Sequence, residues 1–175
     1  DLLGVNQAAS SIPWAWVLAA VIVVACVAYT FWAVPFVKEH ATSFTGLKLL
    51  AIPLALVTGT LEELLFRKFL MDWLDGLGAA GVLQVLAAAV AFGVAHSLWV
   101  LFSRDARIIV PVVTATTALV AALGATYLLA DRNVLPVIAA HIAINLVIEP
   151  WLLLSSINGR WDTSTHEPVS DIRVK

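Results

Sequence analysis

The feature that most constrains the fold is a long uncharged stretch near the start of the chain. Residues 2–37 contain no Asp, Glu, Lys or Arg, and this run is longer than the roughly 20 apolar residues that a helix needs to cross a bilayer. It is also too long for the apolar core of a signal peptide, and Lys38 follows the run instead of preceding it. We therefore expect a retained membrane-spanning helix. Because the chain begins at Asp1 and not at methionine, we also expect residues before it.

The rest of the chain is also suited to an apolar solvent. Of its residues 61% are hydrophobic and 13% are charged, whereas soluble domains carry about a quarter charged residues. Charges and turn formers divide the sequence into five apolar segments, residues 12–36, 49–71, 77–102, 108–130 and 134–157. The sequence therefore predicts an all-α, polytopic transmembrane helical bundle of about five spans in residues 1–157. A polar C-terminal tail follows at residues 158–175.

The connections between these segments are short, which favours antiparallel packing of sequential neighbours. They comprise residues 37–48, 72–76, 103–107 and 131–133. Small residues are frequent in the third and fourth segments and allow close helix approach. We therefore expect those two segments to form the packed centre.

The basic residues predict how the bundle is oriented. Seven Lys and Arg residues lie on the side of the C-terminal tail, and two, Lys68 and Arg132, lie on the other side. The positive-inside rule then places the C-terminus in the cytoplasm. The net charge is −2 without a run of like charges, so nucleic acid is not an expected partner. Cys26 is the only cysteine, which excludes a disulfide framework and a Cys-based zinc site within this sequence.

Three charged residues lie well inside the second predicted span. They are Glu62, Glu63 and Arg67, and each charge at the bilayer centre costs roughly 2.5 to 3.5 kcal/mol on insertion scales. Glu63 and Arg67 are four residues apart with the acid first, the favourable order for an ion pair on a helix. Glu62 is rotated by about 100° from Glu63 and can face elsewhere. One carboxylate could anchor the helix while the other does chemistry, or all three could form a structural polar knot.

Two further spans carry histidine and amide side chains. Phe92 and His96 share one helix face, and so do His141 and Asn145, because each pair is four residues apart. Either pair alone could be a hydrogen-bonded core histidine or a polar contact between helices. Polar groups on three separate apolar helices are better explained by one shared interior site.

Two carboxylates, two imidazoles and an amide suit hydrolysis. A base activates water, an imidazole orients the water, and donors stabilise a developing oxyanion. The same groups could instead hold zinc with an open position, with Glu62, His96 and His141 as ligands. The sequence contains neither H-E-x-x-H nor G-x-S-x-G, so the usual zinc-protease and serine-hydrolase signatures are missing. Zinc therefore stays a possible cofactor, and no cofactor is certain.

Three other residues are assigned outside this site. Glu149 directly precedes Pro150, so we expect it at a kink or an interface. His40 and His166 lie in polar connecting or tail segments, and we expect both to be solvated.

At these positions the sequence resembles the CAAX-prenyl-protease and bacteriocin-processing (CPBP) family of intramembrane endopeptidases, which includes the type II CAAX prenyl endopeptidase. The family pattern E-E-x-x-x-R matches residues 62–67, F-x-x-x-H matches residues 92–96, and H-x-x-x-N matches residues 141–145. The resemblance covers a core at about residues 60–146. It departs at Lys68, where many members have glycine.

The resemblance implies a role for each matching residue. Glu62 would be the general base, and His96 would hold or polarise the attacking water. His141 and Asn145 would stabilise the oxyanion. The residues that would orient or support this site are Glu63, Arg67 and Phe92.

We therefore expect an intramembrane endopeptidase that hydrolyses a bond in a peptide or a membrane-associated protein tail. Water activated by glutamate would be the nucleophile, either metal-free or zinc-assisted. The alternative is a non-catalytic membrane scaffold or assembly subunit that retains the fold. The expected partners are the substrate and the lipid bilayer, and a membrane-protein complex is compatible. The expected location is a prokaryotic plasma membrane.

Overall fold

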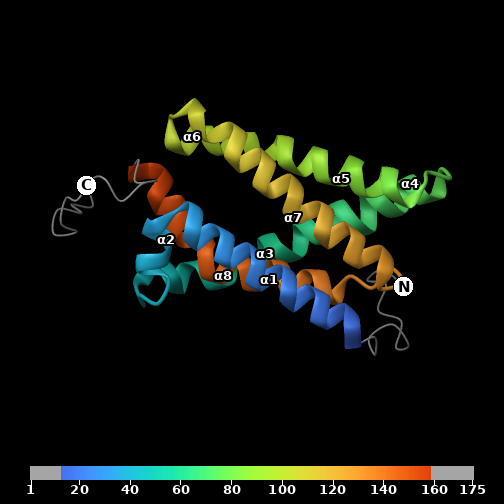
Figure 1. Ribbon diagram of the computed structural model, residues 1–175, viewed down its shortest axis with the longest axis horizontal. Helices are drawn as coiled ribbons and strands as arrows, with labels where there is room; N and C mark the ends of the chain where they lie inside the picture. The colour runs from blue at the N-terminus through green and yellow to red at the C-terminus, as the bar shows by residue number, and fades with distance from the viewer. Residues whose placement is uncertain (1–12, 159–175) are drawn as a thin grey trace.

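The computed structural model describes residues 13–158, and every regular element in that range is helical (Figure 1). Five helical segments are long and apolar enough to cross a membrane: Pro13–Ala33, Gly46–Gly76, Gly81–Trp99, Ala106–Leu129 and Leu135–Ile157. The predicted all-α bundle of about five spans is confirmed. The predicted tail lies outside the described residues apart from Asn158, and so do His166 and the residues before Pro13.

Proline marks the boundary after the first span. Helix α1 (Pro13–Ala33) ends two residues before Pro35, which begins a short helix, α2 (Pro35–His40). Proline has no backbone N–H to donate to a preceding turn, but it fits the first position of a new helix. The first span therefore ends before the predicted residue 36, and a helix occupies part of the predicted connection at 37–48.

The second span is continuous, but its hydrogen-bond register changes. It consists of α3 (Gly46–Glu63), the π-helical segment η2 (Leu64–Met71) and α4 (Asp72–Gly76). Such π-helical turns are rare and occur frequently at functional sites, and this one begins directly after Glu62 and Glu63. The predicted connection at 72–76 is wrong, because the helix continues to Gly76 and the chain turns at Gly78 with φ of 78°.

The third and fourth spans form a closely packed pair. Their elements are α5 (Gly81–His96), η3 (Ser97–Trp99), α6 (Val100–Ser103), η4 (Ala106–Ile108) and α7 (Ile109–Leu129). A Cβ atom on Gly93 of α5 would collide with Oγ1 of Thr117 on α7. The third and fourth spans therefore pack closely, but the prediction that they form the packed centre is wrong, because the fifth span is the most buried of the five.

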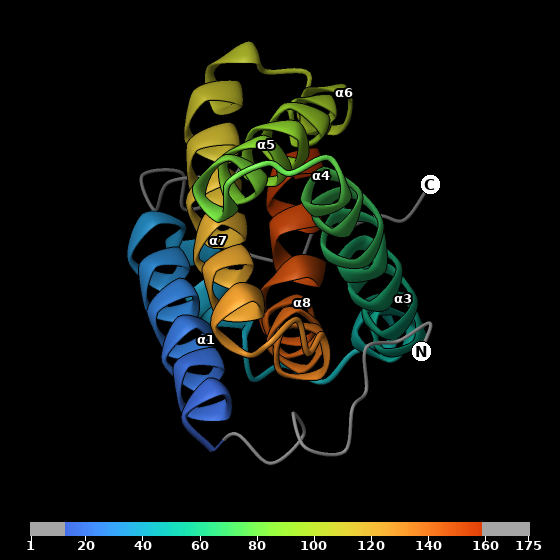
Figure 2. The ribbon, with the colours of Figure 1, turned by 90° about the vertical axis from the view of Figure 1, so that its right-hand side faces the viewer.

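Helix α8 (Leu135–Asn158) lies between α1 and α3 and packs along both (Figure 2). The expectation that sequential neighbours pack together is therefore wrong for α1 and α3. The connection between them contains α2 and is long enough to leave room for α8. Helix α7 makes few direct contacts with α8, and this separation leaves space for the cavity described below.

Two apolar clusters follow one another along α8. One cluster includes Met71, Tyr127 and Val137 and joins the second, fourth and fifth spans. Another includes Val37 and Trp151 and joins α2 to the end of α8. Both clusters hold α8 in place, and α8 carries two of the predicted site residues.

Glycine also fixes α3 against α8. A Cβ atom on Gly59 would lie 3.0 Å from Cγ1 and 3.3 Å from the backbone nitrogen of Ile142. The absence of a side chain therefore lets the two backbones approach closely. Glu63 follows Gly59 by one turn, and His141 directly precedes Ile142, so this contact brings the carboxylate within reach of the imidazole.

Candidate active site

Glu63 and Arg67 form the buried ion pair that their spacing predicts. Nε of Arg67 lies 2.9 Å from Oε2 of Glu63, and both side chains are 0% exposed. Arg67 also donates from Nη2 to the backbone oxygen of Val120, at 3.3 Å, and so ties the second span to α7. Neither charged residue is among those that line the cavity described below. Both residues therefore lie outside the cavity, where they can support the residues that line it.

His141 lies between the two glutamates. Its Nδ1 is 2.7 Å from Oε1 of Glu63, and its Nε2 is 3.3 Å from Oε2 of Glu62. A neutral imidazole has one N–H and donates to only one carboxylate at a time. Arg67 compensates the buried Glu63 carboxylate, and His141 gives both carboxylates a polar neighbour. These contacts explain how the four ionisable groups can share an apolar interior.

His96 is held by the residue one turn before it. Its ring stacks on Phe92 with the ring centroids 4.2 Å apart, and its Nδ1 lies 3.0 Å from the backbone oxygen of Phe92. A carbonyl oxygen only accepts, so Nδ1 carries the proton, and Nε2 of the neutral ring keeps a free lone pair. Phe92 in turn meets Phe66 of η2 edge to face, at 5.0 Å between centroids. His96 can therefore accept a hydrogen bond from water.

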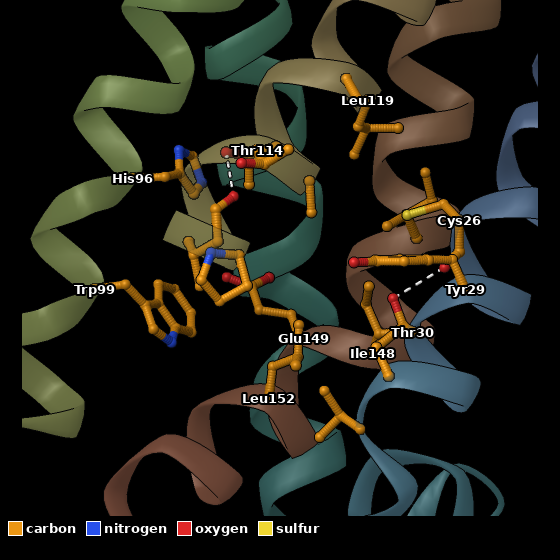
Figure 3. A pocket seen from close by; sticks show the side chains of 18 of the residues that line it. Cys26, Tyr29, Thr30, His96, Trp99, Thr114, Leu119, Ile148, Glu149 and Leu152 are labelled. Carbon is orange, nitrogen blue, oxygen red and sulfur yellow. Dashed lines mark hydrogen bonds between the residues drawn. The ribbon is translucent and has the colours of Figure 1, made fainter. Parts of the chain in front are cut away.

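One large cavity collects the predicted site residues. It has a volume of about 1020 Å³ and lies among α1, α5, α7 and α8 (Figure 3). Its lining includes Glu62, Phe92, His96, His141 and Asn145. The Glu62 side chain is 33% exposed, whereas Glu63 on the adjacent face is fully buried. Most other lining residues are apolar, and fixed donors and charges act more strongly in such surroundings than in water.

Part of the lining was not predicted from the sequence. Glu149, which we expected at a kink or an interface, lines the cavity one turn beyond Asn145. The sequence did contain a signal for this position: Glu149 follows Asn145 by four residues, and residues four apart on a helix share a face. Helix α1 contributes Cys26 and Thr30, and no charged residue on that helix indicated such a role.

The zinc candidates do not form a ready metal site. Among residues 13–158, no three His, Cys, Asp or Glu side chains are grouped so that they could hold one ion. Nδ1 of His141 contacts Glu63, and Nδ1 of His96 contacts a carbonyl oxygen. Zinc-bound histidines commonly make such contacts with the ring nitrogen that does not bind the metal. Zinc therefore stays an alternative, and we assign no catalytic step to a metal.

A second polar cluster holds the far end of the second span. Asp72 accepts hydrogen bonds from Tyr127 at 2.8 Å and from Arg132 at 2.6 Å, and it forms an ion pair with Lys68 at 2.7 Å. Partial burial opposes ionisation of Arg132, but hydrogen bonding to Asp72 and the charge of Asp75 raise the pKa of its guanidinium. These residues are not among those that line the cavity. Lys68, where the sequence departs from the family pattern, therefore belongs to a structural cluster.

One comparison with known protein families gives a match. A family model described as Type II CAAX prenyl endopeptidase Rce1-like matches residues 44–147. The match covers more than half of the 175 residues and contains all three motifs. It begins before the predicted core start at about residue 60 and so includes the whole of α3. No curated protein and no solved structure matches the chain.

Proposed function

Because the chain belongs to the Rce1-like family of type II CAAX prenyl endopeptidases, we propose that it is an active intramembrane endopeptidase in which Glu62 activates water. The observation that carries this proposal is the 3.3 Å contact between Glu62 and His141, on a cavity that His96 and Asn145 also line. A base, an imidazole that holds water and an amide donor are the groups that amide hydrolysis uses.

The first step adds water to the scissile carbonyl group. The Glu62 carboxylate removes one proton from the water, while the other hydrogen is donated to Nε2 of His96. As the new C–O bond forms, the carbonyl π electrons move onto the oxygen, and the Asn145 amide donates to that oxyanion. Glu62 now carries the water proton, so Nε2–H of His141 is released from it and becomes the second oxyanion donor.

The second step breaks the C–N bond. Glu62 gives its proton to the amide nitrogen, the oxyanion electrons rebuild the carbonyl group, and the C–N electron pair leaves with the amine. One water is consumed, and a carboxylic acid and an amine are formed. Glu62 returns to the carboxylate form, so the cluster regains its starting charge. Glu63 and Arg67 hold His141 and η2 in place throughout.

The proposed substrate is a peptide or a protein tail held at the membrane. The cavity lies among helices that can span a bilayer, so the bond that is cut has to enter that region. The family name points to prenylated CAAX tails as one such class. The bilayer is a partner in this proposal, a membrane-protein complex is compatible with it, and nucleic acid is not part of it.

Cleavage by a Glu62→Gln variant tests the proposal. The full chain is reconstituted in lipid nanodiscs and incubated with a library of free and lipidated peptides, and the products are identified by mass spectrometry. We expect cleavage to slow by about 100-fold or more, the range for loss of a general base, with an unchanged melting temperature because glutamine keeps the shape of the side chain. Glu39→Gln removes an exposed carboxylate on α2 and is the matched control.

Each result of this experiment separates two readings. Equal cleavage by wild type and Glu62→Gln would remove Glu62 from the mechanism. A wild-type protein that cuts nothing across the library would favour the non-catalytic scaffold. A parallel reaction with a chelator addresses the metal: unaffected cleavage supports the glutamate mechanism, whereas loss that zinc restores would support the zinc-assisted alternative.

A further inference from the structure

Glu149 is a cavity carboxylate that the proposed hydrolysis does not use. It is half-buried and lies one turn beyond Asn145 on α8. Figure 3 shows it in the cavity between Trp99 on one side and Ile148 on the other. No ion pair within residues 13–158 includes Glu149. It therefore places a carboxylate in the cavity without a cationic partner from the described chain.

The other acids of the cavity differ from Glu149 in this respect. Asp105 pairs with Arg107 at 2.8 Å, and Glu62 contacts His141. Mostly apolar walls make an unpaired charge costly. A cation that enters the cavity is therefore stabilised beside Glu149.

We infer that Glu149 binds a positively charged side chain of the substrate and so selects peptides with Lys or Arg near the bond that is cut. This inference rests on the proposed function. One helical turn separates Glu149 from Asn145, about 6 Å along the axis, and an extended peptide advances about 3.3 Å per residue. The selected basic residue therefore lies within about two residues of the scissile bond.

A peptide cation fits this position better than a metal ion or a proton. No three potential metal ligands among the described residues are grouped around one point, so Glu149 has no ligand set to join. A proton would leave Glu149 neutral, and a neutral carboxyl group would not favour Lys over an uncharged residue. A preference for substrates with a basic residue therefore distinguishes binding of a peptide cation from binding of a metal ion or a proton at Glu149.

The test compares peptides that differ only in charge. A sequence that wild type cuts is taken from the library experiment and made with Lys, Gln or Glu at each position up to two residues from the cut bond. The readout is the ratio of kcat/KM between the Lys and Gln peptides. We expect a ratio of about tenfold or more at one position in wild type, as for other charged hydrogen bonds. The difference should appear mainly in KM.

Two variants connect this ratio to Glu149. In Glu149→Gln we expect the ratio to fall to about one, and in Glu149→Lys we expect the Glu peptide to be preferred. Any effect that Glu149 exerts through Glu62 acts on all three peptides alike and cancels in the ratio. Glu39→Gln again serves as the control and should retain the wild-type ratio.

The outcomes distinguish failure of this inference from failure of the proposed function. A wild-type ratio near one at every position overturns the inference even if no variant folds. So does a Glu149→Gln protein that keeps the wild-type ratio. If wild type cuts no peptide in the library, the proposed function fails, and the inference fails with it.

Discussion

At the scale of single residues, the site depends on four ionisable groups that contact one another. The two carboxylates of Glu62 and Glu63 share His141, and Arg67 pairs with the more deeply buried carboxylate. Removal of one member of the fully buried Glu63–Arg67 pair leaves a surplus charge in an apolar interior, where water cannot solvate it. Stability is therefore more sensitive to the buried pair than to the half-exposed Glu62.

An Arg67→Ala variant tests this dependence. It leaves the Glu63 charge with His141 alone, so we expect the free energy of unfolding to fall by about 3 to 5 kcal/mol, the usual cost of breaking a buried pair. Thermal and denaturant unfolding of the detergent-solubilised protein measure the loss. Arg107→Ala breaks an ion pair whose arginine is 90% exposed and should change stability little. An unchanged melting temperature in Arg67→Ala would mean that water reaches Glu63.

Residue spacing predicted some of these contacts and missed others. Glu63 with Arg67 and Phe92 with His96 were predictable, because residues four apart on one helix must be neighbours. The bridge from His141 to both glutamates was not, because spacing shows which face a residue occupies and not which helix that face meets. The catalytic roles of these residues stay predictions.

At the scale of helices, Gly59 sets the distance between α3 and α8. A Gly59→Leu substitution forces a side chain into the backbone of Ile142, so we expect a loss of about 1 to 3 kcal/mol, as for other overpacked sites. Cleavage should fall as well, because the same shift separates Glu62 from His141. Gly46→Leu, at the start of the same helix, has nothing within 4 Å of its new Cβ atom and is the control. Full stability and activity in Gly59→Leu would show that the helices need not approach so closely.

Helix positions were largely predictable from the sequence, but their internal form was not. Apolar length and flanking charges located all five spans, because a bilayer requires both. The π-helical segment Leu64–Met71 gave no signal, since its composition suits an α-helix equally well. The continuation of this span to Gly76 was missed, because Asp72 and Asp75 were interpreted as charges of a loop. In the structure both pair with Arg132, in the connection between α7 and α8.

At the scale of the whole molecule, the bundle has two distinct ends. Figure 1 shows α2 and α6 at one end and α4 at the other. Lys38 lies on α2 and Arg104 follows α6, whereas Lys68 and Arg132 belong to the cluster near α4. The basic residues are therefore divided between the ends as the five-span topology predicts. The orientation of these ends in a membrane stays a prediction.

Labelling of introduced cysteines tests that orientation. In a Cys26→Ala background, Thr42→Cys follows α2 and Gly76→Cys ends α4, and both positions are exposed. We expect Thr42→Cys to react with a membrane-impermeant thiol reagent only from the cytoplasmic side and Gly76→Cys only from the opposite side, because basic loops are retained in the cytoplasm. Intact cells expose the outer side of the membrane to the reagent, and inverted membrane vesicles expose the cytoplasmic side. The reverse pattern would overturn the predicted topology.

The arrangement of the spans could not be read from their order. Connection lengths suggested that neighbours in sequence are neighbours in space, yet α8 separates α1 from α3. This insertion places His141 beside the second span and opens the cavity toward α1. The site therefore depends on long-range packing, which local patterns do not specify.

Cys26 makes the cavity chemically addressable before any substrate is known. It is the only cysteine of the chain and lines the cavity from α1, on a helix without charged residues. Disulfide-forming fragments can be captured there reversibly, and the mass of the intact protein reports which fragment has stayed. Some fragments can also carry an amine. If such a fragment is captured by the wild-type protein but not by Glu149→Gln, its amine reaches Glu149. The lone thiol thus offers a starting point for covalent ligands.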